Sequence, residues 1–368
     1  MRPPVPPTDD AKRPTVQAGP RSARVALPDR VAVADPATLR RRTATGLLLS
    51  VVAALMYTAA NVALRQLADR KDFDFAIFVT GCKGIVPAAV AWAWIAWGKA
   101  RGLSLLPARR YVPPLLLAAV CTQFVGNVIL QYVFALGGLA IVVPIVFAMI
   151  ILTSAALGFF VLGEPITTLL AAAIGVLIAA IFVLSVGTGD SAAAVAGGGP
   201  AASTTMVVSL SILSGIGYGV TGVMIRLARL GGVSPPGSLV LINTTGVVVL
   251  GSLGFARLGP SGVAAIETAQ FGWMFAASLC TAVAFFALTY SYQVLPVVRV
   301  NLINSSQAAM AAIVGVLLFG EPATAWLVYG TLLTLAGLTI VAYARESAGE
   351  RSDEGAASAG PQTVPVGD

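Results

Sequence analysis

The stretches LGEPIT (Leu162–Thr167) and FGEPAT (Phe319–Thr324) are two copies of one short element, 157 residues apart. In both copies a Gly-Glu-Pro triplet separates two long apolar runs. Glycine readily adopts the left-handed conformation that ends a helix, and proline suits the first turn of the next one. A glutamate is favoured at the N-terminus of that next helix. The element therefore predicts a tight turn between two helices, with a gating role as the alternative, and its recurrence predicts an internal repeat.

A second pair of matching stretches extends the repeat. YTAANVALR (Tyr57–Arg65) and YGVTGVMIR (Tyr218–Arg226) are 161 residues apart. We therefore expect two copies of a five-helix unit, at residues 44–187 and 205–344. Because five is odd, the two copies insert into a membrane in opposite orientations. Inverted repeats are typical of secondary transporters, whose substrate site lies near the membrane midplane.

The composition makes a lipid bilayer the expected environment. Of 368 residues, 57% are hydrophobic and 11% are charged, and the mean hydropathy is +0.87, whereas soluble domains carry about 25% charged residues. The net charge is +7, but the basic residues flank apolar runs, which argues against nucleic acid as a partner. The chain has no histidine, and its cysteines, Cys82, Cys121 and Cys280, lie in apolar runs. They indicate small core residues, with no disulfide, metal site or cofactor expected.

The apolar runs predict an all-α polytopic membrane protein with ten transmembrane helices arranged as two inverted five-helix repeats. A spanning helix needs about 20 apolar residues. The expected spans are Thr45–Leu64, Phe75–Trp97, Val112–Leu136, Leu139–Val161, Pro165–Gly187, Met206–Arg226, Gly237–Phe255, Phe271–Val294, Val297–Phe319 and Pro322–Ala344. Residues 188–204 predict a flexible linker, and residues 1–43 and 345–368 predict disordered cytoplasmic tails.

The distribution of lysine and arginine predicts the orientation. With the N-terminus in the cytoplasm, eleven flanking basic residues fall on the cytoplasmic side and four, Arg65 among them, on the external side. Basic residues are enriched in cytoplasmic loops. We therefore expect a multi-pass protein of the cell inner (cytoplasmic) membrane with both termini in the cytoplasm.

These features resemble the drug/metabolite transporter superfamily of the EamA type. The resemblance covers about residues 45–344 and rests on the two halves, the Gly-Glu-Pro elements and a basic residue in span two. It also rests on the tyrosine-led segments YVFALGGLAIVVP (Tyr132–Pro144) and YSYQVLPVVRVN (Tyr290–Asn301). Family members usually have arginine where this chain has Lys83, and many have a proline midway along spans four and nine. Here Pro144 comes early in span four, and span nine has NLINSSQAAM instead. The resemblance implies a membrane carrier that moves small metabolites, often outward.

Lys83 is the basic residue of the second span. It lies about eight residues from the end of the span, roughly 12 Å deep at 1.5 Å per residue. A lysine at the bilayer centre costs about 2.5–3.5 kcal/mol, so it needs a compensating environment. Partial snorkelling or contacts with backbone carbonyls would supply one, and so would a carboxylate or phosphate of a substrate. No Asp or Glu lies within the ten predicted spans, which favours a partner that arrives with the substrate.

Polar side chains in the other spans are candidates for the lining of a substrate cavity. Gln123, Asn127 and Gln131 recur every fourth residue, which places them on one helical face. Hydrogen bonds that hold the bundle together are the alternative for this face. Tyrosines and amides of other spans complete the set of candidate substrate-binding residues: Tyr57, Asn61, Tyr218, Asn243, Tyr290, Asn301, Asn304 and Gln307.

The expected function is secondary transport of a small polar or anionic metabolite by alternating access, as an exporter or exchanger. No nucleotide-binding motif occurs in the sequence, and without histidine or intramembrane aspartate pairs the known intramembrane protease chemistries are excluded. We therefore expect no enzyme. A membrane channel or scaffold without carrier activity is the alternative, and a homodimer is left open.

Overall fold

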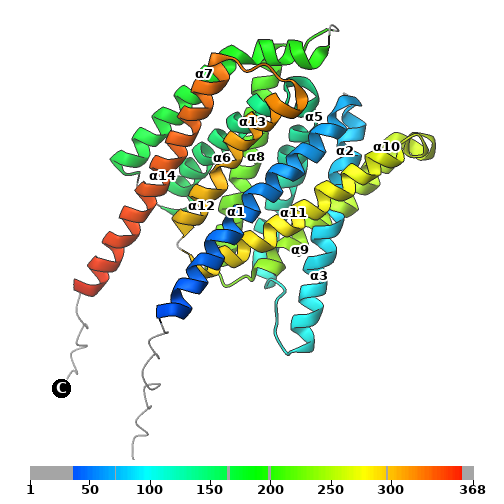
Figure 1. The fold of residues 1–368 in the computed structure, drawn as a ribbon. Helices are drawn as coiled ribbons and strands as arrows, with labels where there is room; N and C mark the ends of the chain where they lie inside the picture. Colours follow the sequence, from blue (N-terminus) through cyan, green and yellow to red (C-terminus); the bar gives the residue numbers. More distant parts are fainter. Residues whose placement is uncertain (1–35, 71, 164–165, 198–199, 296, 359–368) are drawn as a thin grey trace, which may run out of the picture. The chain divides into compact units, whose positions relative to one another are not determined.

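The computed structural model describes residues 36–70, 72–163, 166–197, 200–295 and 297–358, and Figure 1 shows the path of the chain. The described residues from Arg42 onward form one compact unit. All regular structure in the described ranges is helical. Nine of these helices are long and apolar enough to cross a membrane. The prediction of an all-α polytopic membrane protein is therefore confirmed.

The elements follow one another along the chain with short connections. In the first half these are α1 (Pro36–Gln66), η1 (Leu67–Arg70), α2 (Phe73–Lys83), α3 (Ile85–Ala100), η2 (Arg109–Tyr111), α4 (Val112–Val120), the π-helix η3 (Cys121–Val128), α5 (Ile129–Gly137), α6 (Leu139–Leu162) and α7 (Thr168–Ala196). In the second half they are α8 (Thr204–Leu230), α9 (Pro235–Thr245), the π-helix η4 (Gly246–Leu250), α10 (Gly251–Ala264), α11 (Thr268–Val294), α12 (Val297–Ser305), α13 (Gln307–Phe319) and α14 (Ala325–Ser358).

The two Gly-Glu-Pro elements end helices as expected. Gly163 follows α6 with φ of 67° and Gly320 follows α13 with φ of 66°, both in the left-handed region. Their backbone N–H groups donate to the carbonyls of Gly158 and Gly315, which are also 157 residues apart. The predicted glycine caps are therefore confirmed at both positions.

The remainder of the Gly-Glu-Pro element differs from the prediction. The hydroxyl of Thr324 accepts a hydrogen bond from the Leu327 N–H at 3.1 Å, and α14 begins at Ala325. Pro322 therefore precedes α14 and does not lie in its first turn. Thr167 has the same role at the start of α7. Residues 164–165 lie outside the described part of the chain.

The predicted ninth span is broken into α12 and α13. At the break the Ser306 hydroxyl donates to the Ile303 carbonyl at 2.6 Å, and the Gln307 side chain donates to both oxygens of Asn304. Serine and asparagine side chains that bond to nearby backbone compete with helical hydrogen bonding. The cluster of short polar side chains in NSSQ thus explains why one long helix does not form here.

Three predicted boundaries shift because helices are longer than expected. The linker was expected from residue 188, but α7 continues to Ala196 and ends at Gly197 in the left-handed conformation. Thr188 and Ser191 are buried, and the alanine-rich stretch after them favours helix. Likewise α1 begins at Pro36 and α14 continues to Ser358, inside the segments predicted as disordered tails.

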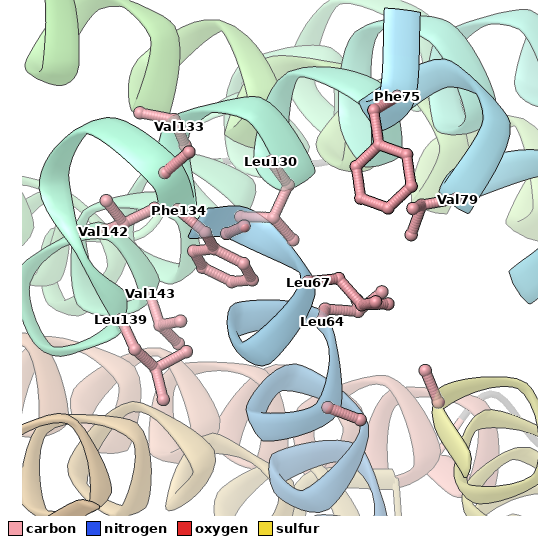
Figure 2. Close-up of a cluster of buried hydrophobic side chains, with 14 of the residues drawn as sticks. Leu64, Leu67, Phe75, Val79, Leu130, Val133, Phe134, Leu139, Val142 and Val143 are labelled. Atoms are coloured by element: carbon pink, nitrogen blue, oxygen red, sulfur yellow. The ribbon is translucent and has the colours of Figure 1, made fainter. Parts of the chain in front are cut away.

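The largest buried apolar cluster lies where the end of α1 meets α2, α5 and α6. Figure 2 shows the side chains that form its centre, among them Leu64, Leu67, Phe75, Phe134 and Leu139. Long helices far apart in sequence also lie side by side, as α7 and α14 do (Figure 1). The helix pair α2–α3 contacts α5 of the first half and α9, α10 and α11 of the second half.

Candidate functional site

Lys83 lies at a break in the second spanning helix. α2 ends at Lys83 and α3 begins at Ile85. Pro87 follows four residues after Lys83 and has no N–H, so the Lys83 carbonyl loses its helical donor. The buried hydroxyl of Ser278, on α11, donates to that carbonyl at 2.8 Å and accepts from the Val86 N–H at 3.0 Å. A side chain of the second half therefore satisfies both backbone groups that the break frees.

The Lys83 side chain enters a polar network built from four helical segments. Its ammonium donates a hydrogen bond to Oδ1 of Asn127, on η3. The same oxygen accepts from the Tyr218 hydroxyl, on α8, at 2.6 Å. Asn127 Nδ2 donates to Gln123 Oε1 at 3.0 Å, and Gln123 Nε2 donates to the Ile242 carbonyl, on α9, at 3.0 Å. We call Lys83, Gln123, Asn127 and Tyr218 the polar network.

The π-helical segment η3 determines which side chains meet in the network. A π-helix places about one extra residue in a turn, and such turns are frequent at functional sites. Side chains of α8 bond to this distorted stretch: Ser214 donates to the Gly126 carbonyl at 2.9 Å, and Thr221 Oγ1 accepts from the Thr122 hydroxyl at 2.5 Å. The distortion is thus fixed by packing against α8, and it directs Gln123 and Asn127 toward Lys83.

Gln131 does not join the polar network, although its spacing predicted one face shared with Gln123 and Asn127. Its Nε2 donates to the Leu64 carbonyl, at the end of α1, at 2.9 Å. Its Oε1 is buried and has no hydrogen-bond partner within the described residues. The change from π-helix to α-helix after Val128 alters the rotation per residue, which separates Gln131 from the other two amides.

The other candidate residues lie at several places in the bundle. Tyr57 and Asn61 lie one turn apart on α1 and are partly buried. Asn243 bonds to the Leu239 carbonyl of its own helix, and Tyr290, 42% exposed, lies at the rim of an apolar hollow.

The candidates of the ninth span bond to one another. Gln307 is buried, and its Nε2 lies 2.6 Å from Asn304 Oδ1. The side chain of Asn301 lies outside the described part of the structure. No hydrogen bond among the described side chains joins Asn304 or Gln307 to Lys83, so the structure does not assemble all twelve candidates into one site.

An apolar hollow of about 680 Å³ lies among α1, α3 and α11. Leu49 and Val52 line it from α1, Val86 and Trp94 from α3, and Phe286 from α11. The rings of Trp94 and Phe286 stack with centroids 5.4 Å apart. Val86 is also the residue whose N–H bonds to Ser278, so one wall of the hollow adjoins the helix break at Lys83.

The charges of the site favour an anion. Two ion pairs occur between described residues, Arg65–Glu321 and Arg257–Asp74, and neither involves Lys83. An ammonium carries three N–H donors, and the described structure uses one of them, on an uncharged amide oxygen. A cation in low dielectric without a carboxylate partner attracts anionic groups strongly. No group of three potential metal-ligating side chains occurs among the described residues.

Sequence reasoning missed a second buried charged group. Arg65, expected on the external flank, is 5% exposed, and its Nε lies 3.2 Å from Oε1 of Glu321, which is 3% exposed. Glu321 was expected at the N-terminus of α14, but its carboxylate accepts from the Leu139 and Ala140 N–H groups at the start of α6. One signal in the sequence was available: Arg65 ends the first repeated stretch and Arg226 ends the second, so an arginine recurs at this position.

Comparisons with known proteins bear on the fold alone. The chain matches no family model and no curated protein. A solved crystal structure, described only as a protein, is similar with a TM-score of 0.51 and 14% identity over 81% of this chain and 96% of that one. At this identity the likeness shows a shared fold alone.

Proposed function

We propose that this protein is a secondary transporter that moves a small polar or anionic metabolite across the cytoplasmic membrane by alternating access, as an exporter or exchanger. The observation that carries the proposal is the polar network. An ammonium without a carboxylate partner among the described residues lies within an apolar, membrane-spanning bundle. An intramembrane charge most often marks a solute or ion pathway.

The composition of the network fits a carrier built from two halves. Lys83 and Asn127 belong to the first half, while Tyr218 and the Ile242 carbonyl belong to the second. In carriers with repeated halves the site lies at the interface between the halves, and their relative motion changes its access. A ligand bound here would contact both halves at once. Its affinity would therefore depend on the position of one half relative to the other.

Local geometry supports two inverted five-helix repeats with ten transmembrane helices. The caps at Gly163 and Gly320 have almost equal φ and ψ, and the hydroxyls of Thr167 and Thr324 accept hydrogen bonds three residues further on in both copies. In this proposal α12 and α13 together form the ninth span. The same features support membership of the EamA-type drug/metabolite transporters, with both termini in the cytoplasm.

The substrate class follows from the donors of the site. Lys83 supplies positive charge, and the Tyr218 hydroxyl and the side-chain amides supply neutral hydrogen-bonding groups. A carboxylate or phosphate would replace the Asn127 oxygen, or join it, as the acceptor for the ammonium. Charge-assisted hydrogen bonds are stronger than neutral ones, so the network favours an anionic group over a neutral one.

Thermal stabilisation of the purified protein tests the proposed site. Amino acids, sugar phosphates, nucleotides and cationic drugs are added in turn to the wild type and to Lys83→Met. We expect an anionic compound to raise the melting temperature of the wild type and not that of Lys83→Met. Equal stabilisation of both proteins, or stabilisation by cations alone, would show that Lys83 is structural and that the anionic assignment is wrong.

A further inference from the structure

The buried carboxylate of Glu321 joins three segments that are far apart in sequence. Arg65 Nε, at the end of α1, donates to its Oε1 at 3.2 Å. The Leu139 N–H donates to Oε1 at 2.7 Å and the Ala140 N–H donates to Oε2 at 2.6 Å, both from the first turn of α6. Glu321 itself lies between α13 and α14. The contact therefore ties the second half of the chain to two helices of the first half.

The surroundings are shaped for this carboxylate. Gly138 has φ of 80° and ψ of −179°, a conformation essentially restricted to glycine, and a Cβ there would lie 2.5 Å from the carboxylate. A Cβ on Gly315 would lie 2.7 Å from Oε2. The Arg65 guanidinium also lies 5.0 Å above the ring of Phe319. Two glycines and an aromatic ring thus leave room for the ion pair and hold it in place.

Little free space lies between η1, which follows Arg65, and the helices around it. A cavity of about 10 Å³ lies between η1, α2 and α5, lined by Leu67, Phe75, Gln131 and Ala135 among others, and it has room for about one water molecule. The buried Oε1 of Gln131 points to no hydrogen-bond partner within the described chain, although an unmade hydrogen bond is costly. A water molecule that entered here in another conformation would supply the missing hydrogen bond.

The opposite part of α1 borders much more space. Leu49 and Val52 line the hollow of about 680 Å³, and at 1.5 Å per residue they lie roughly 20 Å along α1 from Arg65. A carrier that alternates access closes one end of its path while the other end is accessible. The small cavity next to η1, of about 10 Å³, and the hollow of about 680 Å³ along the other end of α1 differ in this sense.

We propose that Arg65, Glu321 and the first turn of α6 form an ionic latch, which closes one end of the solute path and opens past Gln131 when it is released. The inference rests on the proposed function, because a latch of this kind has a role only in a carrier. It adds a conformational role for the Gly-Glu-Pro element: the glycine ends α13, and the glutamate holds α6 and α1.

Thiol labelling of the small cavity tests the latch without a transport assay. Cys82, Cys121 and Cys280 are replaced by alanine, and Ala135→Cys, which lines the cavity, becomes the reporter. The probe is a maleimide added to the full chain purified in detergent. We expect Glu321→Gln to raise the labelling rate about tenfold or more, because the glutamine loses the charge-assisted hydrogen bonds to Arg65 and α6.

Two further variants make the result specific. Gly315→Ala keeps every charge but places a methyl group against the carboxylate, so we expect faster labelling here as well. Asp74→Asn removes an exposed ion pair with Arg257, whose side chains are 29% and 62% exposed, and should leave labelling unchanged. Each labelling rate is measured at the same number of degrees below the melting temperature of that variant. This removes the effect of a general loss of stability. If Glu321→Gln does not accumulate, Gly315→Ala decides the question.

The outcomes separate a latch from a structural ion pair. Faster labelling in Glu321→Gln or Gly315→Ala, with Asp74→Asn unchanged, supports the latch. A lower melting temperature with unchanged labelling in both variants, or equal acceleration in Asp74→Asn, overturns it. Because labelling needs no transport, a carrier that lacks the latch fails only this experiment. A protein with the latch that binds and moves no solute fails only the tests of the proposed function.

Discussion

Arg65→Met should lower the free energy of unfolding by about 3–5 kcal/mol, the usual cost of removing one partner of a buried ion pair. The variant leaves the Glu321 carboxylate, 3% exposed, with two backbone donors and no cation. Reversible unfolding in mixed detergent micelles measures the loss. A double variant, Arg65→Met/Glu321→Gln, should recover part of it, because an uncharged amide is less costly to bury than an unpaired carboxylate.

Arg257→Met is the matched control for this prediction. Arg257 pairs with Asp74 at 3.0 Å, similar to the Arg65–Glu321 distance, but its side chain is 62% exposed. Exposed ion pairs contribute about 0–1 kcal/mol, so the control should lose no more than that. Similar losses in Arg65→Met and Arg257→Met would contradict the inference that burial makes the Glu321 contact energetically important.

Asn127→Asp should stabilise the fold and at the same time weaken the binding of anions by about tenfold or more, the equivalent of one lost charge-assisted hydrogen bond. Asn127 Oδ1 accepts from Lys83 and Tyr218, and an aspartate keeps both contacts while it supplies a counter-ion. It loses the Nδ2 donor to Gln123, but that neutral hydrogen bond is weaker than the charge-assisted contact that the aspartate gains with Lys83. The ammonium is then neutralised within the protein, and an added carboxylate or phosphate meets a negative charge. Melting temperature with and without an anionic compound measures both effects.

Asn127→Leu should show the opposite pattern at the same position. It removes the hydrogen bonds to Lys83, Tyr218 and Gln123, so the fold should lose stability. The ammonium then lacks its amide partner, and an anionic compound should stabilise this variant at least as strongly as the wild type. If both variants responded to anions as the wild type does, Lys83 would not be an anion site.

Features that depend on neighbouring residues were predictable from the sequence. Gly163 and Gly320 end their helices in the left-handed conformation because glycine has no Cβ, and the length and hydropathy of the runs are enough to predict spanning helices. Lys83 could also be identified from the sequence, because a charged side chain within an apolar run is costly to bury in any helical bundle. Pro87, four residues later, was a readable signal of the helix break at Lys83.

Features that depend on how distant helices meet were not predictable in the same way. The four-residue spacing of Gln123, Asn127 and Gln131 assumed a regular α-helix, and the π-helix η3 changed which of them share a face. Glu321 lies outside the apolar runs, and its partner Arg65 is 256 residues away in the chain. Only the packing of α1, α6 and α13 brings these two charges together.

Counterflow in proteoliposomes tests the central claim most directly. Vesicles loaded with an unlabelled anionic compound that stabilises the wild type are diluted into a trace of the same compound carrying a radiolabel. A carrier that alternates access should accumulate the label transiently, with saturable rates, and Lys83→Met should abolish this accumulation. Linear, non-saturating flux without counterflow would indicate a pore, and equal counterflow in Lys83→Met would contradict the proposed role of the polar network.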